Sequence, residues 1–457
     1  MRDKETGYHE VNQEGAPGKS GNFCGGKRLS AMRLVIVSAL LVAAITGMLV
    51  GRWSVGLVDA EVESYENLKT FTEVLSLVKK NYVEEVKTKD LIYGAIKGML
   101  NSLDPHSGFM TPDAFKEMQV DTKGEFGGIG IQIGIKDGLL TVIAPIEDTP
   151  AFKAGLSAGD RIIKINDEST KDMGLHEAVS KMRGPKGTTV KITILREGWK
   201  EPKDFTITRD IIKVKSVKYK VIDEGIGYIK LTQFQEQTAS DLSAALSKLS
   251  EEKIDSLILD VRNNPGGLLS SAVDVASQFL PPGRLIVYTK DRSGEKVEYQ
   301  SSGNRPYYDK LTMVVLVNQG SASASEIVAG ALKDWSRAVL VGVQTFGKGS
   351  VQSVIPLSDG SGIRLTTARY YTPKGISIQN TGITPDIIVK IETKNGKEHV
   401  VVREKDLQKH LKNDQKEEKR EEDKETAPIE VSEKDDTQLQ RAVDLLKTWR
   451  VFKGSKA

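Results

Sequence analysis

The chain has 457 residues, of which 39% are hydrophobic and 28% are charged. This length allows about three ordinary domains, and this composition excludes a disordered or a wholly membrane-embedded protein. The 65 lysines and arginines nearly balance the 62 aspartates and glutamates, and a net charge of +3 disfavours a dedicated nucleic-acid-binding protein. Cys24 is the one cysteine, which excludes an intrachain disulfide and a cysteine-based metal cluster.

An uncharged apolar run covers residues 34–51. At helical rise it spans about 27 Å, which is close to the thickness of a bilayer's hydrocarbon core. Basic residues precede the run and acidic residues follow it: Lys27, Arg28 and Arg33, then Asp59, Glu61 and Glu63. This charge bias predicts a cytoplasmic tail over residues 1–33, one transmembrane anchor, and an extracytoplasmic remainder. The alternative is a signal peptide cleaved after Ala60, which would release a secreted protein, but the run exceeds the usual signal-peptide length.

The remaining chain changes its pattern several times. Apolar residues at three- and four-residue spacing predict an N-terminal helical region over residues 60–118. Short alternating strands follow over 119–207, and strands alternate with helices over 208–400, which predicts a largely parallel sheet. The dense charges of 401–436 indicate a solvated linker or a long exposed helix, whereas 437–457 is an amphipathic C-terminal helix expected to dock on the body or on a second subunit.

His106 lies in a loop, SLDPHSGFM, that ends the helical region. A catalytic histidine needs an acidic or nucleophilic partner, and the local pattern suggests none. The Asp104-Pro105 turn signal explains the loop without any chemistry. We therefore interpret His106 as a loop residue, and a catalytic role is the less favoured alternative.

The region 119–207 contains a glycine-rich stretch, Gly127-Gly128-Ile129-Gly130-Ile131, and later AGLSAGDRIIKIN. The order of these stretches resembles a PDZ domain of the circularly permuted bacterial kind. That resemblance implies peptide binding at Gly128, Ile129, Gly130 and Ile131. The physics agrees, because consecutive N–H groups in a glycine turn bind a terminal carboxylate and the following strand edge pairs with an extended peptide.

Three turns follow strands of the core, with the sequences RNNPGG (262–267), GSASASE (320–326) and FGKGSVQ (346–352). A serine at a strand-to-helix junction is suited to be a nucleophile, because the helix N-terminus is electropositive. The alternative is structural, since Ser323 and Glu326 have the spacing of a capping box. No histidine lies in a loop at this edge of the sheet, so a Ser-His-Asp triad is disfavoured. Lys348 could act as the base if burial lowers its pKa, and its alternative is a surface lysine.

A nucleotide-binding interpretation also starts from this last turn. GVQTFGK (342–348) satisfies the first seven positions of a P-loop. Gly349 then stands where a magnesium-binding serine or threonine is needed, and the next segment has the pattern of a strand rather than a helix. Both conditions of the motif fail, which disfavours nucleotide binding.

Together with GITPDI (382–387), these three turns resemble the carboxyl-terminal processing, or tail-specific, peptidases over about residues 62–450. The resemblance implies an α/β core with a ClpP/crotonase-like parallel sheet and an inserted β-rich PDZ domain, beside the N-terminal helical segment and the one transmembrane helix. It also implies site residues: Ser323 as nucleophile, Lys348 as general base, Gln352 as the group that orients the lysine, and Gly267 and Ala324 as oxyanion-hole donors. Arg183 resembles the PDZ arginine proposed to link bound peptide to the active site.

We therefore expect a serine endopeptidase with a Ser-Lys pair. Its partners would be exported proteins or peptides with unstructured C-terminal tails, and it would reach the membrane through its N-terminal helix. No cofactor, metal or nucleic acid is expected, and the amphipathic tail and the resemblance are compatible with a homodimer. The alternative is a catalytically inactive PDZ-bearing scaffold or adaptor at the membrane. Retention of Ser323, Lys348 and Gln352 together argues against that alternative.

Overall fold

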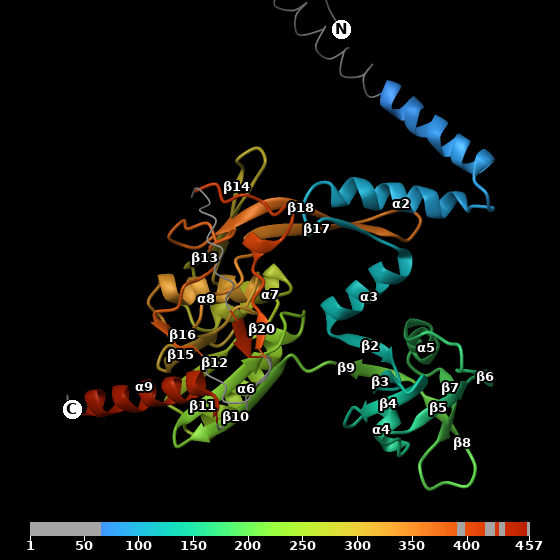
Figure 1. Ribbon diagram of the computed structural model, residues 1–457. Coiled ribbons are helices and arrows are strands. Elements are labelled where there is room, and N and C mark those ends of the chain that lie inside the picture. Colours follow the sequence, from blue (N-terminus) through green and yellow to red (C-terminus); the bar gives the residue numbers. More distant parts are fainter. Residues whose placement is uncertain (1–64, 391–397, 416–425, 429–434, 455–457) are drawn as a thin grey trace, which may run out of the picture. The chain divides into compact units, whose positions relative to one another are not determined.

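The computed structural model describes residues 65–390, 398–415, 426–428 and 435–454 (Figure 1). The chain divides into two compact units, residues 1–92 and 93–457. The predicted transmembrane segment at 34–51 lies outside the described residues. Among the helices that are described, none combines the length and the apolar character needed to cross a bilayer.

The N-terminal region is helical over residues 65–81 and in α2 (Thr88–Asn101). It is not helical throughout, because β1 (Gly108–Met110) pairs antiparallel with Gly362–Arg364. The predicted loop SLDPHSGFM thus follows α2 and contains a short strand, because Gly362–Arg364 offers backbone partners to its last residues. α3 (Pro112–Lys123) begins only after this strand.

The core is a six-stranded sheet in the order β10-β11-β12-β15-β16-β19. All strand pairs are parallel except β10 with β11, which confirms the predicted sheet type. The strands are β10 (Val217–Asp223), β11 (Ile226–Leu231), β12 (Ser256–Asp260), β15 (Thr312–Val317), β16 (Val339–Gly342) and β19 (Ile387–Ile388). Leu257 and Leu259 pack with one buried cluster and Ile258 with another, so both faces of β12 are covered and its sequence is a continuous apolar run.

Four helices cover the two faces of this sheet (Figure 1). α6 (Thr238–Glu251), α7 (Leu269–Ser277) and α8 (Ala324–Asp334) share the larger cluster with Leu257 and Leu259. α9 (Thr437–Gly454) buries Ala442 and Leu446 against the cluster that contains Ile258. The C-terminal helix thus docks on the body of its own chain.

A buried ion-pair network fixes the start of α9. The Arg262 guanidinium donates to both carboxylate oxygens of Asp436 at 2.8 Å and to Asp260 at 2.7 Å. It also donates to the Gln438 side chain at 3.0 Å. Bidentate arginine–carboxylate pairs are geometrically specific, so this network joins α9 to the turn that begins at Arg262.

A second, antiparallel sheet carries the strand that follows Lys348. β18 (Gly362–Tyr371) pairs with β1, with β17 (Ser350–Pro356) and with β13 (Leu285–Asp291), and β14 (Lys296–Gln300) pairs with β13. Because β1 and β17 both pair with β18, residues near position 106 and residues near position 348 meet at one strand. This sheet therefore brings the loop around His106 and the turn around Lys348 close together.

The predicted PDZ region is a separate sheet with its own core. It contains β3 (Ile131–Lys136), β4 (Leu139–Pro145), β5 (Arg161–Ile165), β6 (Glu168–Ser169), β7 (Thr189–Leu195) and β8 (Lys203–Thr208), with α4 (Pro150–Lys153) and α5 (Leu175–Met182). Ile129, Ile162 and Ile192 belong to one buried cluster. β2 (Glu125–Gly128) pairs instead with β9 (Asp210–Lys213). The segment that leads into this region and the segment that leads out of it therefore lie side by side.

The charged segment after the core departs from the prediction. β20 (Glu398–Val400) pairs with β21 (Thr426–Pro428), and η1 (Glu404–Asp406) lies between them in the sequence. Glu404 is 0% exposed, and the Asn413 side chain donates to the Gln379 carbonyl oxygen at 2.5 Å. A solvated linker was therefore wrong for residues 401–415, because these polar groups bind polar groups of the core. Residues 416–425 and 429–434 lie outside the described residues.

Candidate active site

The three turns that stood out in the sequence lie at one edge of the core sheet. β12, β15 and β16 are neighbours, and Asp260, Leu316 and Val341 are in register across them. The turns leave the carboxyl ends of these strands, which is the edge where open α/β sheets form their sites. The predicted meeting of the three turns is confirmed by this register.

Ser323 is the N-cap residue of α8, with φ 54° and ψ −113°. Non-glycine residues rarely adopt this conformation, and it concentrates at functional sites. The neighbouring serines are engaged elsewhere: the Ser321 and Ser325 hydroxyls each donate to a backbone carbonyl oxygen at 2.8 Å. Among the described residues, the Ser323 hydroxyl donates to no backbone carbonyl oxygen. The phenol of Tyr370, whose pKa burial raises, donates to the Lys348 carbonyl oxygen. Ser323 is thus the serine of this turn whose hydroxyl is not bound to a backbone carbonyl oxygen within the described residues.

Glu326 completes the predicted capping box and also joins two of the turns. Its fully buried carboxylate accepts the Thr345 hydroxyl at 2.5 Å and the Gly347 N–H at 2.7 Å through Oε1. Through Oε2 it accepts the N–H of Ser323 at 2.8 Å and the N–H of Lys348 at 3.0 Å. One oxygen atom therefore holds the backbones of both residues next to each other. Burial raises the pKa of Glu326 to about 7, although these four donors favour its ionised form.

The RNNPGG turn packs directly on this nucleophile. A Cβ atom on Gly266 would lie 2.8 Å from the Ser323 Cβ, and one on Gly267 would lie 2.1 Å from the Phe234 carbonyl oxygen. Asn264 is 0% exposed, and its side-chain oxygen accepts the Gly266 N–H at 2.9 Å. Within the described residues, the N–H groups of Gly267 and Ala324 donate to no acceptor. Two such donors beside a nucleophile are what an oxyanion hole requires.

Lys348 is partly buried and not the surface lysine of the alternative interpretation. Burial lowers its pKa, and the positive charge of Arg364 lowers it further. The negative charges of Glu404, Glu326 and Asp104 act in the opposite direction. The net lowering favours the neutral amine, which is the form that can accept a proton. Among the described residues, the Lys348 amine makes no hydrogen bond, so it is available to a neighbouring hydroxyl.

Gln352 lies where the register of β17 against β18 shifts. Its amide nitrogen donates to the Ser350 hydroxyl at 3.0 Å and to the Thr366 hydroxyl at 3.4 Å. No hydrogen bond joins Gln352 to Lys348 in the described part of the chain. Thr366 in turn donates to Asp104 at 3.2 Å, so Gln352 belongs to the polar network beside the base.

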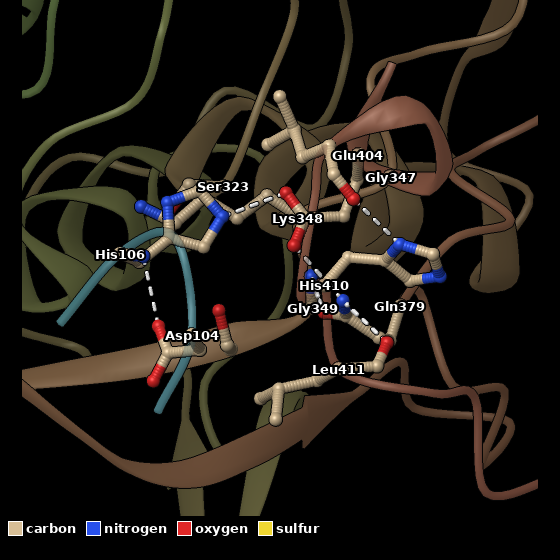
Figure 2. Close-up of polar contacts among 12 residues, drawn as sticks. Asp104, His106, Ser323, Gly347, Lys348, Gly349, Gln379, Glu404, His410 and Leu411 are labelled. Atoms are coloured by element: carbon tan, nitrogen blue, oxygen red, sulfur yellow. Dashed lines mark hydrogen bonds and ion pairs between the residues drawn. The ribbon is translucent and has the colours of Figure 1, made fainter. Parts of the chain in front are cut away.

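Two residues near Lys348, Asp104 and Glu404, were not predicted from the sequence as part of this site, and a third, His106, was interpreted as a loop residue (Figure 2). The His106 ring nitrogen Nε2 lies 2.7 Å from Glu404 Oε2, and the His106 N–H donates to Asp104 at 2.8 Å. The interpretation of His106 as a loop residue was therefore incomplete. Its partner, Glu404, is almost 300 residues away in the sequence. No local pattern signals such a pair. Only a buried acid within a charged run could have suggested it, and burial is not visible in a sequence.

The predicted carboxylate-binding loop of the PDZ region has the conformation that glycine permits. Gly130 has φ 80°, and a Cβ atom there would lie 2.3 Å from the Thr149 Cβ. The Thr149 hydroxyl donates to the Gly130 carbonyl oxygen at 3.0 Å and fixes the loop from behind. The Ile129 side chain is buried in the PDZ core, so it can serve a peptide only through its backbone. Gly128 is the last residue of β2 and Ile131 the first of β3.

Arg183 follows α5 and lines a cavity of about 380 Å³ between α3 and α5. Its guanidinium lies 4.6 Å from the centre of the Phe126 ring, a cation–π contact next to the glycine-rich loop. His176 lines the same cavity and pairs with Glu117 at 3.2 Å. Arg183 is thus placed beside the predicted peptide site.

Substituting Gly130 by alanine is expected to weaken the binding of a tail peptide about tenfold or more, because both the positive φ and the Thr149 contact oppose a Cβ atom. Gly138→Ala is the matched control, since Gly138 has φ 75° in open space. Fluorescence anisotropy with a labelled apolar peptide, carboxylate against amide, measures the difference. Equal affinities of the Gly130→Ala and Gly138→Ala variants would contradict the loop assignment.

The segment after FGKG does not have the structure that a P-loop needs. β17 begins at Ser350, directly after FGKG, so no helix N-terminus follows as a P-loop requires. Within the described residues, no group of three or more His, Cys, Asp or Glu side chains is arranged to hold a metal ion.

Family models match three consecutive parts of the chain. The model described as "Activating protease CtpB N-terminal domain" matches residues 55–114, and "PDZ domain" matches residues 117–195. "Peptidase family S41" matches residues 225–389, which contain all three turns of the site.

Curated relatives extend the match over most of the chain. A carboxy-terminal-processing protease of Bartonella bacilliformis is 46% identical over 396 residues, which cover 85% of this chain and 90% of the relative. The carboxy-terminal processing protease CtpB of Bacillus subtilis is 38% identical over 336 residues, or 73% and 70% of the two chains. A solved structure, the photosystem II D1 C-terminal processing protease, is 31% identical, covers 70% of this chain and 92% of that chain, and has a TM-score of 0.41.

Proposed function

The chain belongs to peptidase family S41, among the carboxy-terminal processing proteases, and we propose that Ser323 and Lys348 are its catalytic pair. Membership confirms the resemblance drawn from the sequence, and the protein is a serine peptidase with a PDZ domain. One observation carries the assignment of the pair. A single oxygen of Glu326 binds the backbone nitrogens of both residues, so a serine and a lysine from separate turns lie beside each other.

The reaction we propose is an acyl transfer in two halves. Lys348, whose pKa burial lowers, accepts in its neutral form the proton of the Ser323 hydroxyl as that oxygen attacks the scissile carbonyl. The N–H groups of Gly267 and Ala324 donate to the resulting oxyanion, each contributing on the order of 3 kcal/mol to the barrier reduction. Lys348 then passes the proton to the leaving amine. Water, activated by the same lysine, hydrolyses the acyl-enzyme.

Gln352 keeps a supporting role in this proposal. Its amide bonds to Ser350 of β17 and to Thr366 of β18, the strand with which β17 pairs. It therefore orients the lysine through the strand that the lysine precedes rather than by direct contact.

The substrate class we propose is proteins with unstructured C-terminal tails. The loop at Gly128, Ile129, Gly130 and Ile131 would bind the terminal carboxylate through backbone N–H groups, and Arg183 beside Phe126 would respond to the bound tail. Support comes from the glycine conformation at Gly130 and from the match to a PDZ family model. The tail would then be held while the peptidase core cuts the chain near that end.

We also propose that residues 34–51 anchor the protein in the cell membrane with the catalytic part outside the cytoplasm; secretion after signal cleavage is the alternative. The length of this apolar run and the charges around it support the anchor.

A homodimer is supported by the end of α9, where Trp449, Val451 and Phe452 are 55%, 68% and 66% exposed. Three exposed apolar side chains on one helical turn favour contact with a second copy.

An active-site label tests the nucleophile. A fluorophosphonate should add once to the full-length wild type, with the adduct on Ser323 by peptide mass spectrometry. The Ser323→Ala variant should remain unlabelled and should not cut an unfolded protein with an apolar tail. The Ser325→Ala variant is the matched control, because its hydroxyl donates to a backbone carbonyl, and it should still be labelled. Labelling of Ser323→Ala would contradict the assignment, and tail binding without labelling of wild type would favour the inactive scaffold.

A further inference from the structure

The segment of residues 401–415, called the strap from here on, brings a buried acid into the active site. Glu404 is 0% exposed, although its neighbours Lys405 and Asp406 are exposed. A buried carboxylate is costly unless it is paired and hydrogen-bonded, so its partners indicate what it does. The proposed reaction assigns it no role.

One oxygen of Glu404 faces the loop that precedes β1. Oε2 lies 2.7 Å from His106 Nε2, and the imidazole is itself largely enclosed (Figure 2). The backbone N–H of His106 donates to Asp104, which also accepts the Ser107 hydroxyl at 2.6 Å. These bonds fix the backbone of the loop at His106, and the imidazole that it carries contacts the carboxylate.

The other carboxylate oxygen of Glu404 and its backbone N–H are linked to the backbone on both sides of Lys348. Oε1 accepts the Gln379 amide at 3.0 Å, and the Gln379 side-chain oxygen accepts the Gly349 N–H at 3.0 Å. The Glu404 N–H donates to the Phe346 carbonyl oxygen at 3.2 Å. Phe346 and Gly349 flank Gly347 and Lys348. Glu404 is therefore hydrogen-bonded to the turn before the lysine directly and after the lysine through Gln379.

Glu404 is also one of the charges that Lys348 meets from the surrounding elements. Arg364 on β18 is the positive charge, and Glu404 on the strap, Glu326 on α8 and Asp104 in the loop before β1 are the negative ones. The pKa of Lys348 reflects this balance. Glu404 favours the protonated lysine, and burial together with Arg364 favours the neutral one.

We propose that Glu404 is a positioning residue for the general base. It fixes the Phe346–Gly349 turn through Gln379 and its own backbone, and its charge, held by His106, opposes that of Arg364 at the Lys348 amine. This inference rests on the proposed role of Lys348 and deepens it. The strap is then part of the active site, and the site is complete only when a segment almost 60 residues beyond the lysine has docked.

The test is the pH dependence of cleavage by the full-length Glu404→Gln variant, which keeps the shape of the side chain and removes its charge. The active lysine is neutral, so kcat/KM rises with pH through the pKa of Lys348. Removing a charge that favours the protonated lysine moves this rise to lower pH. The variant also holds the Phe346–Gly349 turn less firmly. We therefore expect kcat at high pH, where the profile is flat, to fall roughly tenfold to a hundredfold.

The matched control is Glu251→Gln, the same change of charge at an exposed residue that ends α6 and pairs with Lys248 at the surface, and it should keep the wild-type profile. An unshifted rise in Glu404→Gln would overturn the inference, whatever its kcat. If thermal melting shows that Glu404→Gln does not fold, Glu404→Asp replaces it. This variant keeps the charge but withdraws it from His106, so it should lower kcat without a shift, and wild-type kcat would overturn the inference. Activity retained in Lys348→Met would identify a failure of the base assignment instead.

Discussion

Lys348→Met is expected to lower kcat/KM for tail cleavage by a factor on the order of 10⁴ or more, because the base that accepts the Ser323 proton is removed while the oxyanion donors stay. Lys348→Arg should be as inactive, since a guanidinium does not lose its proton in this environment. Single-turnover cleavage of an unfolded protein with an apolar tail measures the loss. Binding of a tail peptide by both variants is the control, and it should be unchanged.

Stability separates this catalytic loss from damage to the fold. Burial lowers the pKa of Lys348 in the folded protein below its ordinary value of 10.5. Between these two values the unfolded chain binds more protons than the folded one, so the Lys348 contribution to the free energy of unfolding increases with pH. The methionine variant should lack this increase and should be no less stable than wild type at neutral pH. A variant that is inactive because it is unfolded would contradict this account, as would retained activity.

Glu326→Ala is expected to reduce both stability and activity. The change leaves the N–H groups of Ser323, Gly347 and Lys348 and the Thr345 hydroxyl without their acceptor in a buried site. Each unsatisfied buried donor costs about 1–3 kcal/mol, so the free energy of unfolding should fall by about 4 kcal/mol or more. Because the two catalytic backbones are no longer tied to one oxygen, kcat should fall about a hundredfold as well.

Denaturant unfolding and fluorophosphonate labelling rates measure these two losses on the same preparations. Glu251→Ala is the matched control, because Glu251 ends a helix of the same core and pairs only at the surface, with Lys248 at 3.1 Å. Exposed pairs of this kind contribute about 0–1 kcal/mol. If Glu326→Ala labelled at the wild-type rate and unfolded at the same denaturant concentration, Glu326 would not be the link between the two turns.

Much of the core could be predicted because its signals are local. SLILD and TMVVLV are apolar on both faces, and such runs bounded by glycine and polar turns predict buried parallel strands. Ser323 and Glu326 are three residues apart, so the capping box also follows from spacing alone. Parallel strands place their carboxyl ends at one edge, and the meeting of the three turns follows from that rule.

The prediction failed where partners are distant in the sequence or where charge was taken as a sign of exposure. Glu404 lies in a charged run that resembles a linker, yet His106 and Gln379 satisfy it inside the protein. The short strand β1 has no pattern of its own and forms because β18 offers it an edge. Composition measures the average polarity of a segment, whereas burial depends on whether each polar group finds a partner.

The sequence by itself indicated the α/β core, the family, and the serine and the lysine that we propose as the catalytic pair. These depend on periodicity and on short motifs, and such features are properties of neighbouring residues. Only the tertiary structure decided how the pair is supported: Glu326 holds both backbones, Asn264 binds the RNNPGG turn, and the strap places Glu404 beside the turn that carries Lys348. The physical reason is that hydrogen bonds and buried charges act over a few ångströms, and only folding brings residues hundreds of positions apart within that range.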